Sequence, residues 1–219
     1  SGSYSKMDVT ANGIQSTVLR AKVQIPENQF LLTIIGSDQT NKLCFQTFDK
    51  IKNRTSVFLE GFNSSESLIK SELPFYRNGA DAIAASSDNS VWVAIAGECY
   101  QFENDKWSLR DYHFFNVPPS YSCVEIKTDP DQQKLYFLFK EFPFNKSIIK
   151  IIGNNYVKSI ESDEPITNLS IGDEDQFLFI SNGILHLYNK DHLLTWNDFN
   201  GNVWESISNA IIDSENKIW

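Results

Sequence analysis

The sequence predicts an all-β fold, a β-propeller built from four-stranded antiparallel blades. Three observations support this prediction. A motif of an apolar strand, an acidic or amide-rich turn and an apolar-aromatic strand recurs along the 219 residues. The last four copies are spaced by roughly 41–44 residues, which is the length of a propeller blade. Aromatic residues, which favour strands, make up 13% of the chain.

The first two strands of each blade, strands A and B, carry the repeated motif. The clear copies begin with "DAIAASSDNSVWVAIAG", and a weaker copy, "RAKVQIPENQFLLTIIG", precedes them. The residue that follows the turn marks the same position of strand B in every copy. These positions are Leu31, Trp92, Tyr136, Leu178 and Trp219.

Two further strands, C and D, complete each copy. The turns "FENDKW", "IGNNYV" and "YNKDHL" between them contain Asn, Asp and Gly, the residues that hairpins require. Strands A and B are the most apolar and are expected to lie deepest, with strand D at the rim. A sandwich would not need this period, and a solenoid would need a shorter one. The predicted blades are residues 20–60, 80–115, 121–161 and 165–200, with an incomplete blade at 204–219.

The first spacing, from Leu31 to Trp92, is longer than the others by about 20 residues. The excess falls in residues 61–79, where Asn, Ser and Gly indicate an inserted loop. Within this loop, residues 64–73 begin with a capping-type pattern and are a candidate for a short helix.

The chain ends on "AIIDSENKIW", which matches strand A and the beginning of strand B of a fifth blade. Two outcomes are compatible with this ending. In one, the residues before Arg20 supply the missing strands and close the ring, because an open sheet edge invites aggregation. In the other, the chain is a segment of a larger propeller whose remaining blades lie outside it.

Charge and composition argue against several classes of function. The net charge is −9 at pH 7, so the surface repels phosphate backbones and we expect no nucleic-acid partner. No apolar run approaches the ~20 residues that are needed to span a bilayer. The three cysteines, Cys44, Cys99 and Cys123, are widely spaced and are expected to be small buried hydrophobes, while a disulfide between two of them stays open.

No catalytic or cofactor-binding motif stands out, and we expect no cofactor and no enzyme activity. The three histidines do not form a metal-ligand pattern. The acidic turns "DPDQQ" and "GDEDQ" lack the further oxygen ligands of a calcium loop, so we expect their carboxylates to bind the turn backbone. The paired carboxylates of a glycosidase are not excluded, although no particular pair stands out.

One face of a propeller carries the B–C and D–A loops, and here these loops hold an excess of aromatic residues. They are residues 113–121, 140–146 and 196–204. Aromatic rings stack on sugar rings while amides and carboxylates bind hydroxyls, so a glycan or an extended peptide is the expected partner. The alternative is that these aromatics cap the seams between blades. The candidate binding residues are His113, Phe114, Phe115, Tyr121, Phe142, Phe144, Trp196, Asp198 and Trp204.

The stretches "SSDNSVWVAIAGECYQFENDKW", "GDEDQFLFISNGILHLYNKD" and "IDSENKIW" share an Asp, an apolar or aromatic pair that begins three to five residues later and, where the chain continues, a Gly before the next strand. This pattern resembles the two-component regulator propeller repeat. The resemblance implies a non-enzymatic sensor domain of a larger signalling protein, periplasmic or extracellular, ahead of a membrane-bound histidine kinase. The repeats also resemble those of tectonin-type lectins, which implies carbohydrate binding. A propeller glycosidase is the third hypothesis.

Overall fold

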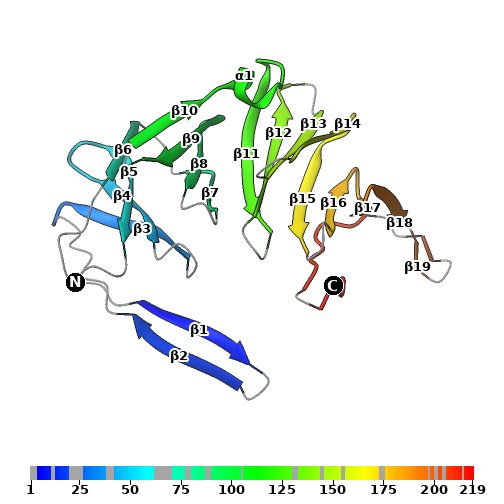
Figure 1. Ribbon diagram of the computed structural model, residues 1–219, viewed down its shortest axis with the longest axis horizontal. Helices are drawn as coiled ribbons and strands as arrows, with labels where there is room; N and C mark the ends of the chain where they lie inside the picture. The colour runs from blue at the N-terminus through cyan, green and yellow to red at the C-terminus, as the bar shows by residue number, and fades with distance from the viewer. Residues whose placement is uncertain are drawn as a thin grey trace. The chain divides into compact units, whose positions relative to one another are not determined.

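The fold consists of four-stranded antiparallel sheets in which each strand pairs with its neighbour in the sequence (Figure 1). There are four such sheets and two two-stranded ones among the described residues. This confirms the predicted all-β, propeller-type fold. The chain divides into two compact units, Ser1–Gly79 and Ala80–Trp219. The computed structural model describes residues 4–10, 13–19, 27–37, 42–61, 71–76, 80–86, 90–104, 106–129, 133–143, 146–153, 156–172, 176–196, 198–199, 202–203, 206–213 and 215–219.

The first unit contains a hairpin and the first four-stranded sheet, which we call blade 1. The hairpin joins β1 to β2 in a two-stranded antiparallel sheet, and blade 1 follows in the order β3-β4-β5-β6. The strands are β1 (Tyr4–Thr10), β2 (Gly13–Leu19), β3 (Gln29–Ser37), β4 (Lys42–Asp49), β5 (Arg54–Gly61) and β6 (Ser71–Tyr76).

The predicted boundaries of blade 1 are wrong. The segments predicted as its strands B, C and D are β3, β4 and β5, which are strands A, B and C of the sheet. The segment predicted as an inserted loop contains β6, which pairs with β5 as the fourth strand. Leu31 therefore lies in strand A, whereas Trp92 lies in the strand B of its own sheet. The predicted helix at 64–73 is wrong for its last three residues, which belong to β6; residues 62–70 lie outside the described residues.

A register shift near the start of strand A supports this corrected frame. Such shifts, which mark β-bulges, occur in β3 between Leu31 and Thr33, and in the strands A of two later sheets. The apolar runs of strands A and B resemble each other, so the sequence alone is compatible with β3 being either strand A or strand B of blade 1. Pairing with β6 selects the frame in which β3 is strand A.

The second unit contains blades 2, 3 and 4. Each is a complete four-stranded sheet, and a small hairpin and an isolated bridge between Ile212 and Ile218 follow. The strands of blade 2 are β7 (Ala82–Ala85), β8 (Val91–Ile95), β9 (Glu98–Glu103) and β10 (Lys106–Arg110). Blade 3 has β11 (Tyr121–Thr128), β12 (Lys134–Glu141), β13 (Ser147–Gly153) and β14 (Tyr156–Ser162). Blade 4 has β15 (Ile166–Ile171), β16 (Gln176–Ser181), β17 (Ile184–Asn189) and β18 (His192–Trp196), followed by β19 (Asp198–Phe199) and β20 (Asn202–Val203).

Burial in these blades is greatest in strand B. All five residues of β8 are buried, and the middle of β12 and nearly all of β16 are buried as well. Strand D is mostly exposed in β14 and β18, as expected for a rim strand. Strand A is only partly buried in β11, so the expectation that strands A and B lie deepest holds there for strand B alone.

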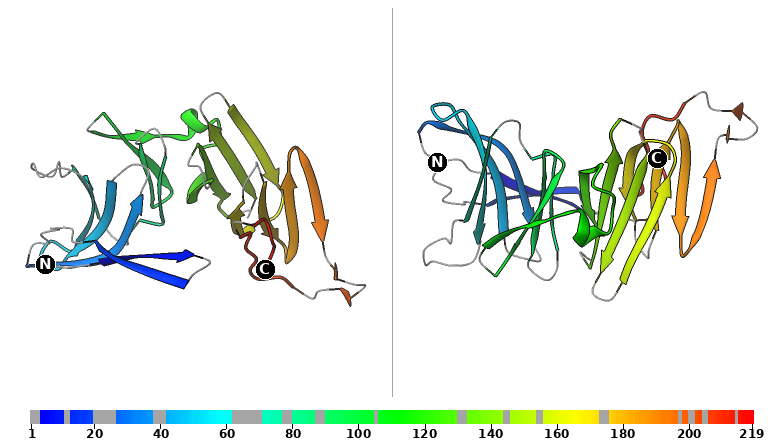
Figure 2. Two further views of the ribbon diagram at one scale, coloured as in Figure 1. Left: turned by 60° about the horizontal axis from the view of Figure 1, so that its bottom comes forward. Right: turned by 90° about the horizontal axis from the view of Figure 1, so that it is seen from above.

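Alternation along strand B gives each blade two packing faces. Leu135, Phe137 and Phe139 of β12 pack in a hydrophobic cluster with blade 2. Tyr136 and Leu138 point the other way and pack with blade 4. The sheets β11–β14 and β15–β18 accordingly lie face to face (Figure 2). Because successive side chains of a strand point to opposite faces, one apolar run fills both seams.

In blades 2, 3 and 4 the aligned repeat residue lies on the same face of its sheet, whereas Leu31 and Trp219 are 40% and 72% exposed. Trp92 packs toward blade 3, Tyr136 packs toward blade 4, and Leu178 packs toward Ala210 and Ile212. All three are 3% exposed or less. In these three blades, the residue that the repeat aligns is therefore the one that packs against the sheet or segment that follows.

The A–B turns use carboxylates to bind the backbone, as the sequence predicted. Asp129 Oδ1 accepts a hydrogen bond from the Lys134 amide at 3.0 Å. Asp213 Oδ1 accepts hydrogen bonds from the amides of Glu215 and Lys217, both at 2.9 Å. The indole Nε1 of Trp219 donates to Asp213 Oδ2 at 2.7 Å. Asp173 and Asp175 of the "GDEDQ" turn lie outside the described residues.

The turn at Asp213 is expected to weaken in acid. The hydrogen bonds from Trp219 and from the Lys217 amide lower the pKa of Asp213 below its ordinary value of 3.8. A lowered pKa stabilises the turn at higher pH, and this contribution is lost as the pH falls through the lowered value. The NMR shift of the Trp219 indole proton should therefore titrate with a midpoint below pH 3.8. The change should be absent in Asp213→Asn, and a midpoint above 3.8 would contradict the assignment.

Candidate ligand-binding site

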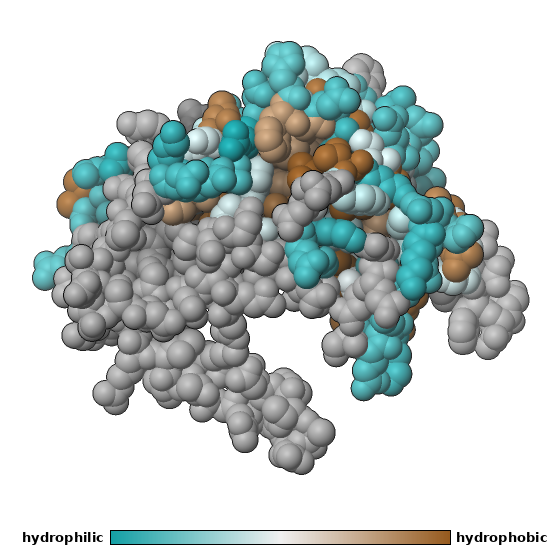
Figure 3. Space-filling model, viewed as in Figure 1, coloured by the Kyte–Doolittle hydropathy of each residue, from teal (hydrophilic) through white to brown (hydrophobic). Residues whose placement is uncertain are grey.

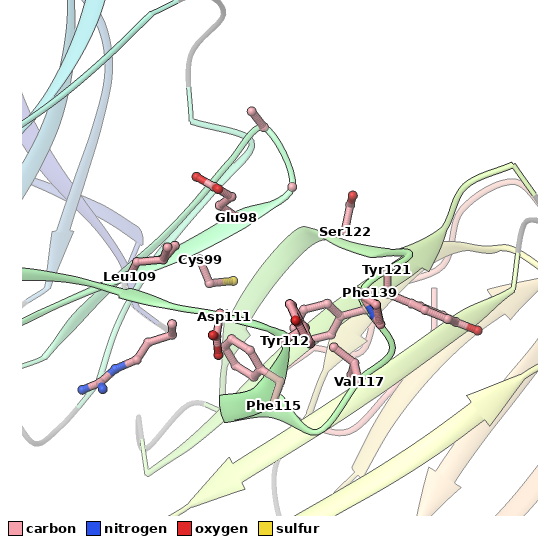
Figure 4. Close-up of a pocket in the computed structure, with 14 residues that line it drawn as sticks. Glu98, Cys99, Leu109, Asp111, Tyr112, Phe115, Val117, Tyr121, Ser122 and Phe139 are labelled. Atoms are coloured by element: carbon pink, nitrogen blue, oxygen red, sulfur yellow. The ribbon is translucent and has the colours of Figure 1, made fainter.

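A cavity of about 380 Å³ lies at the seam between blades 2 and 3 (Figure 4). Its walls come from the B–C turn of blade 2, from strands C and D of blade 2 and from the D–A loop that connects the two blades. The first residues of β11 and Phe139 of β12 complete the lining. These are loops of the face on which the sequence placed the binding site.

The B–C turn of blade 2 is held in place by bonds to both of its neighbours. Ala96 and Gly97 have φ values of 51° and 87°, the left-handed conformation of a two-residue hairpin turn. Asp81 Oδ2 accepts a hydrogen bond from the Ala96 amide at 3.0 Å. The Gly97 carbonyl accepts one from the Cys123 amide at 2.9 Å. The turn thus connects blade 2 directly to strand A of blade 3.

The same kind of connection recurs at the next two seams. In each case an amide of the segment after a blade, Ile166 in strand A of blade 4 or Ile207 beyond blade 4, bonds to the B–C region of the preceding blade. The pairs are Ile166 N with Ser147 Oγ at 3.0 Å and Ile207 N with Gly183 O at 3.0 Å.

The D–A loop folds over the seam as a short helix, α1 (Tyr112–Phe115). The helix was not predicted, although its capping residues are visible in the sequence. Asp111 caps its N-terminus by accepting from the amides of His113 and Phe114, both at 3.1 Å. Asn116 ends it in the left-handed conformation, with a φ of 49°.

Phe115 anchors the loop in the core below. Its ring lies 4.8 Å from that of Phe137 and 4.9 Å from that of Phe139, between centroids. It is 3% exposed. Phe115 and Phe139, together with Val117 and Cys99, give the cavity an apolar side. In Figure 4, Phe115, Val117, Tyr121 and Phe139 lie across from Glu98 and Leu109.

Polar groups line the other parts of the wall. The Tyr100 hydroxyl donates to Glu98 Oε2 at 2.8 Å. Burial and this carboxylate raise the pKa of Tyr100 to about 12. Tyr100 therefore stays a hydrogen-bond donor at neutral pH, and the side-chain oxygens of Glu98 keep lone pairs that can accept from a ligand.

Arg110 provides the positive charge of the wall. Its Nε donates to Gln101 Oε1 at 2.8 Å, and its guanidinium lies 3.5 Å from Glu103. It also lies over the Phe114 ring, 5.0 Å from the centroid. These contacts turn Arg110 partly toward its own sheet, so Glu98 and Asp111 set the charge of the cavity together with it.

Two of the predicted binding residues, Phe115 and Tyr121, line the cavity. Phe115 supports the wall from within the core, and Tyr121 is half-buried at the entrance of strand A. His113 and Phe114 are exposed on α1 beside it. Near α1, hydrophobic side chains reach the surface among hydrophilic ones (Figure 3).

The other predicted residues lie elsewhere. Phe142 is 83% exposed in the B–C loop of blade 3. Trp196 packs against the cluster of Leu178, Leu185 and Ala210, so it caps a seam as the alternative interpretation expected. Asp198 lies in β19, and Phe144 and Trp204 lie outside the described residues.

Sequence reasoning missed the residues that blade 2 contributes. Glu98 was read as part of an ordinary strand, and Arg110 and Asp111 as the end of another. The glycine before Glu98 was the available signal, because a two-residue turn with positive φ brings strand C close to the next blade. The lining residues outside the predicted loops are Ala96, Gly97, Glu98, Cys99, Leu109, Arg110, Asp111, Tyr112, Ser122 and Phe139, while Val117 and Pro119 lie in the predicted loop 113–121.

In the part of the chain that the structure describes, no three His, Cys, Asp or Glu side chains are grouped to hold a metal ion. Within the same ranges, no helix is long and apolar enough to cross a membrane. The sequence matches no protein-family model and no curated protein.

Solved structures share the fold at low identity. The extracellular domain of BT4673 from B. thetaiotaomicron, assigned as a one-component system, has a TM-score of 0.55 and 14% identity over 98% of this chain and 30% of that one. An oligogalacturonate lyase in complex with manganese has a TM-score of 0.55 and 12% identity, over 91% and 61%. Regucalcin, a calcium-binding protein from Agrobacterium tumefaciens, has 0.51 and 11%, over 86% and 66%. The chain spans less than two thirds of each, and identities this low show the fold alone.

Proposed function

We propose that this chain is a non-enzymatic recognition domain, the extracellular or periplasmic ligand-input part of a larger signalling protein. The observation that carries the proposal is the cavity between blades 2 and 3, built from the B–C turn and the D–A loop. A ligand there would touch both blades at once, so its binding would change how firmly the seam is held. The similarity in fold to the extracellular domain of BT4673 supports a signalling role.

The chemistry of the wall favours an uncharged, hydroxyl-rich ligand, such as a neutral glycan. Glu98 and Asp111 offer carboxylate oxygens to hydroxyl donors, and the Tyr112 and Tyr121 hydroxyls can donate or accept. The Tyr121 ring is half-buried and provides apolar area against a sugar ring. Two carboxylates beside a single arginine, in a chain of net charge −9, disfavour a polyanion.

The proposal is tested by measuring how neutral disaccharides change the thermal stability of the chain. Cellobiose, xylobiose, mannobiose and lactose are the probes, with digalacturonate as the acidic comparison. A ligand that binds only the folded chain raises the free energy of unfolding by RT ln(1 + [L]/Kd), which is about 2.7 kcal/mol at a concentration 100 times the Kd, and the unfolding temperature rises with it. We expect one neutral sugar to stabilise the chain and digalacturonate not to do so.

Glu98→Gln should weaken binding of that sugar at least about tenfold, because it removes a charged acceptor worth roughly 1.5–3 kcal/mol. Glu215→Gln is the matched control. It changes the same residue type in an A–B turn, on the opposite face, and should leave binding unchanged. Equal loss in both variants, or stabilisation by digalacturonate alone, would contradict the proposed site.

Two alternative functions, a lectin and a glycosidase, would give experimental results that differ from those of a sensor domain. A lectin would bind the same sugars, but its gene would encode no membrane segment and kinase downstream of this domain. A glycosidase is favoured only by the presence of both Glu98 and Asp111 in one cavity. It would hydrolyse nitrophenyl glycosides, and turnover that disappears in Glu98→Gln would replace the recognition role with a catalytic one.

A further inference from the structure

Two cysteines face each other across the seam between blades 2 and 3. Cys99 lies in β9 and Cys123 in β11, and they are 1% and 0% exposed. Both belong to the hydrophobic cluster that joins the two blades. The two side chains are neighbours, Cys123 Sγ donates to the Glu125 carbonyl at 3.8 Å, and both cysteines are free thiols in this structure.

The backbone holds the two cysteines in this arrangement. Gly97 forms an antiparallel bridge with Cys123, and the Cys123 amide donates to the Gly97 carbonyl at 2.9 Å. Cys99 follows Gly97 by two residues, in β9, and pairs with Ala94 of β8. Since side chains two residues apart share a face, the position of Cys99 is fixed by the bridge at Gly97.

We propose that Cys99 and Cys123 form a disulfide that joins blade 2 to blade 3 when the protein folds in an oxidising compartment. The two thiols lose two protons and two electrons, and one sulfur–sulfur bond forms. A disulfide oxidant, such as oxidised glutathione, accepts the electrons and protons and leaves as two thiols. The reaction needs no group from the cavity wall beyond the two cysteines.

The timing of this oxidation follows from burial. Burial, followed by the neighbouring Cys99 thiol, raises the pKa of Cys123 well above its ordinary value. Because the thiolate is the nucleophile, Cys123 reacts slowly once the seam has closed. The bond should therefore form during folding, while the finished protein, purified in the reduced state, should oxidise much more slowly.

The bond would also change the candidate binding site. Cys99 lines the cavity, and Cys123 directly follows Ser122, which lines it too. A covalent link at this point limits how far the B–C turn of blade 2 can move from strand A of blade 3. Unlike the hydrogen bond at Gly97, it would hold the seam regardless of temperature until it is reduced.

Peptide mapping of the wild-type chain tests the proposal without any variant. The chain is refolded with a glutathione redox pair, alkylated with iodoacetamide and digested with trypsin. Cleavage after arginine and lysine places Cys99 in peptide 78–106, Cys123 in peptide 111–127 and Cys44 in peptide 43–50. We expect peptides 78–106 and 111–127 to be linked, and to separate with dithiothreitol, while Cys44 is alkylated.

Thermal unfolding gives a second measurement. Reduction should lower the unfolding temperature of the oxidised wild type by roughly 6–12 °C, as for a disulfide that closes a short loop. Cys123→Ala should show no response to dithiothreitol, and Cys44→Ala should respond as the wild type does. Complete alkylation of Cys99 and Cys123 after oxidative refolding, or a link that includes Cys44, would overturn the proposal and leave the pair as buried packing thiols.

Discussion

Phe137→Ala is expected to lower the free energy of unfolding by about 3–5 kcal/mol, the usual cost of removing a buried phenylalanine ring. Phe137 is 0% exposed and lies at the centre of the cluster that joins blades 2 and 3. Its ring meets Trp92 edge-on at 5.1 Å and Phe115 at 4.8 Å, between centroids. A rigid sheet cannot close the resulting cavity, so both neighbouring rings lose contacts.

Urea unfolding, followed by tryptophan fluorescence, measures this loss. Phe142→Ala is the matched control, because it removes the same ring from a position that is 83% exposed. It should change stability by less than about 0.5 kcal/mol. Similar losses in the two variants would show that the seam between blades 2 and 3 is not packed around Phe137.

Gly97→Ala is expected to destabilise the chain by about 2–4 kcal/mol, from two separate causes. The φ of Gly97 is 87°, a conformation that alanine adopts at a cost of about 1–2 kcal/mol. A Cβ at this position would also lie 2.6 Å from Ser122 Oγ and 2.8 Å from Ser122 Cβ. The turn would have to move away from blade 3, which weakens its bond to Cys123.

A double-mutant cycle separates these causes. Ser122→Gly removes the atoms that would clash, so in its background Gly97→Ala should cost only the conformational part. Gly153→Ala serves as a control at a glycine without positive φ, where the nearest atom is the flexible Lys134 Cγ at 3.2 Å. It should cost less than about 1 kcal/mol. If Gly97→Ala is as mild as Gly153→Ala, the close approach of the blades at Ser122 is wrong.

Purification of the reduced and the oxidised chain should precede both measurements. If the link between Cys99 and Cys123 forms, it will keep the seam together in part of the unfolded ensemble and change the slope of the urea transition. The comparison of variants is therefore cleanest in dithiothreitol, where the noncovalent contacts of the seam act alone.

The candidate site was only partly predictable from the sequence. Its D–A loop could be identified because aromatic residues are concentrated between two strands, and Phe115 and Tyr121 do line the cavity. The exposure of Phe115 could not be predicted, because a Phe in a loop has the same local pattern whether it points outward or into a seam. Trp196 shows the same ambiguity, since it packs against Leu178 and Ala210 instead of facing a ligand.

The sequence by itself determined the repeating unit. Successive side chains of strand B point to opposite faces of the sheet, and both sets are apolar. This local pattern is sufficient to predict a sheet that is packed between two others. Three of the aligned repeat residues, Trp92, Tyr136 and Leu178, pack against the sheet or segment that follows their own blade. The turn residues, such as Gly97 and Gly183, could also be identified, because positive φ favours glycine.

Only the tertiary structure decided which strands form blade 1 and which residues share the cavity. Strands A and B have similar apolar runs, so the frame of blade 1 depends on the pairing of β5 with β6. Glu98 and Tyr121 meet at one cavity, and Cys99 meets Cys123, because the bond between Gly97 and strand A of blade 3 fixes the seam. The alternation of side chains along a strand is a local property of the sequence. Contacts between two blades depend instead on how one sheet is placed against the next.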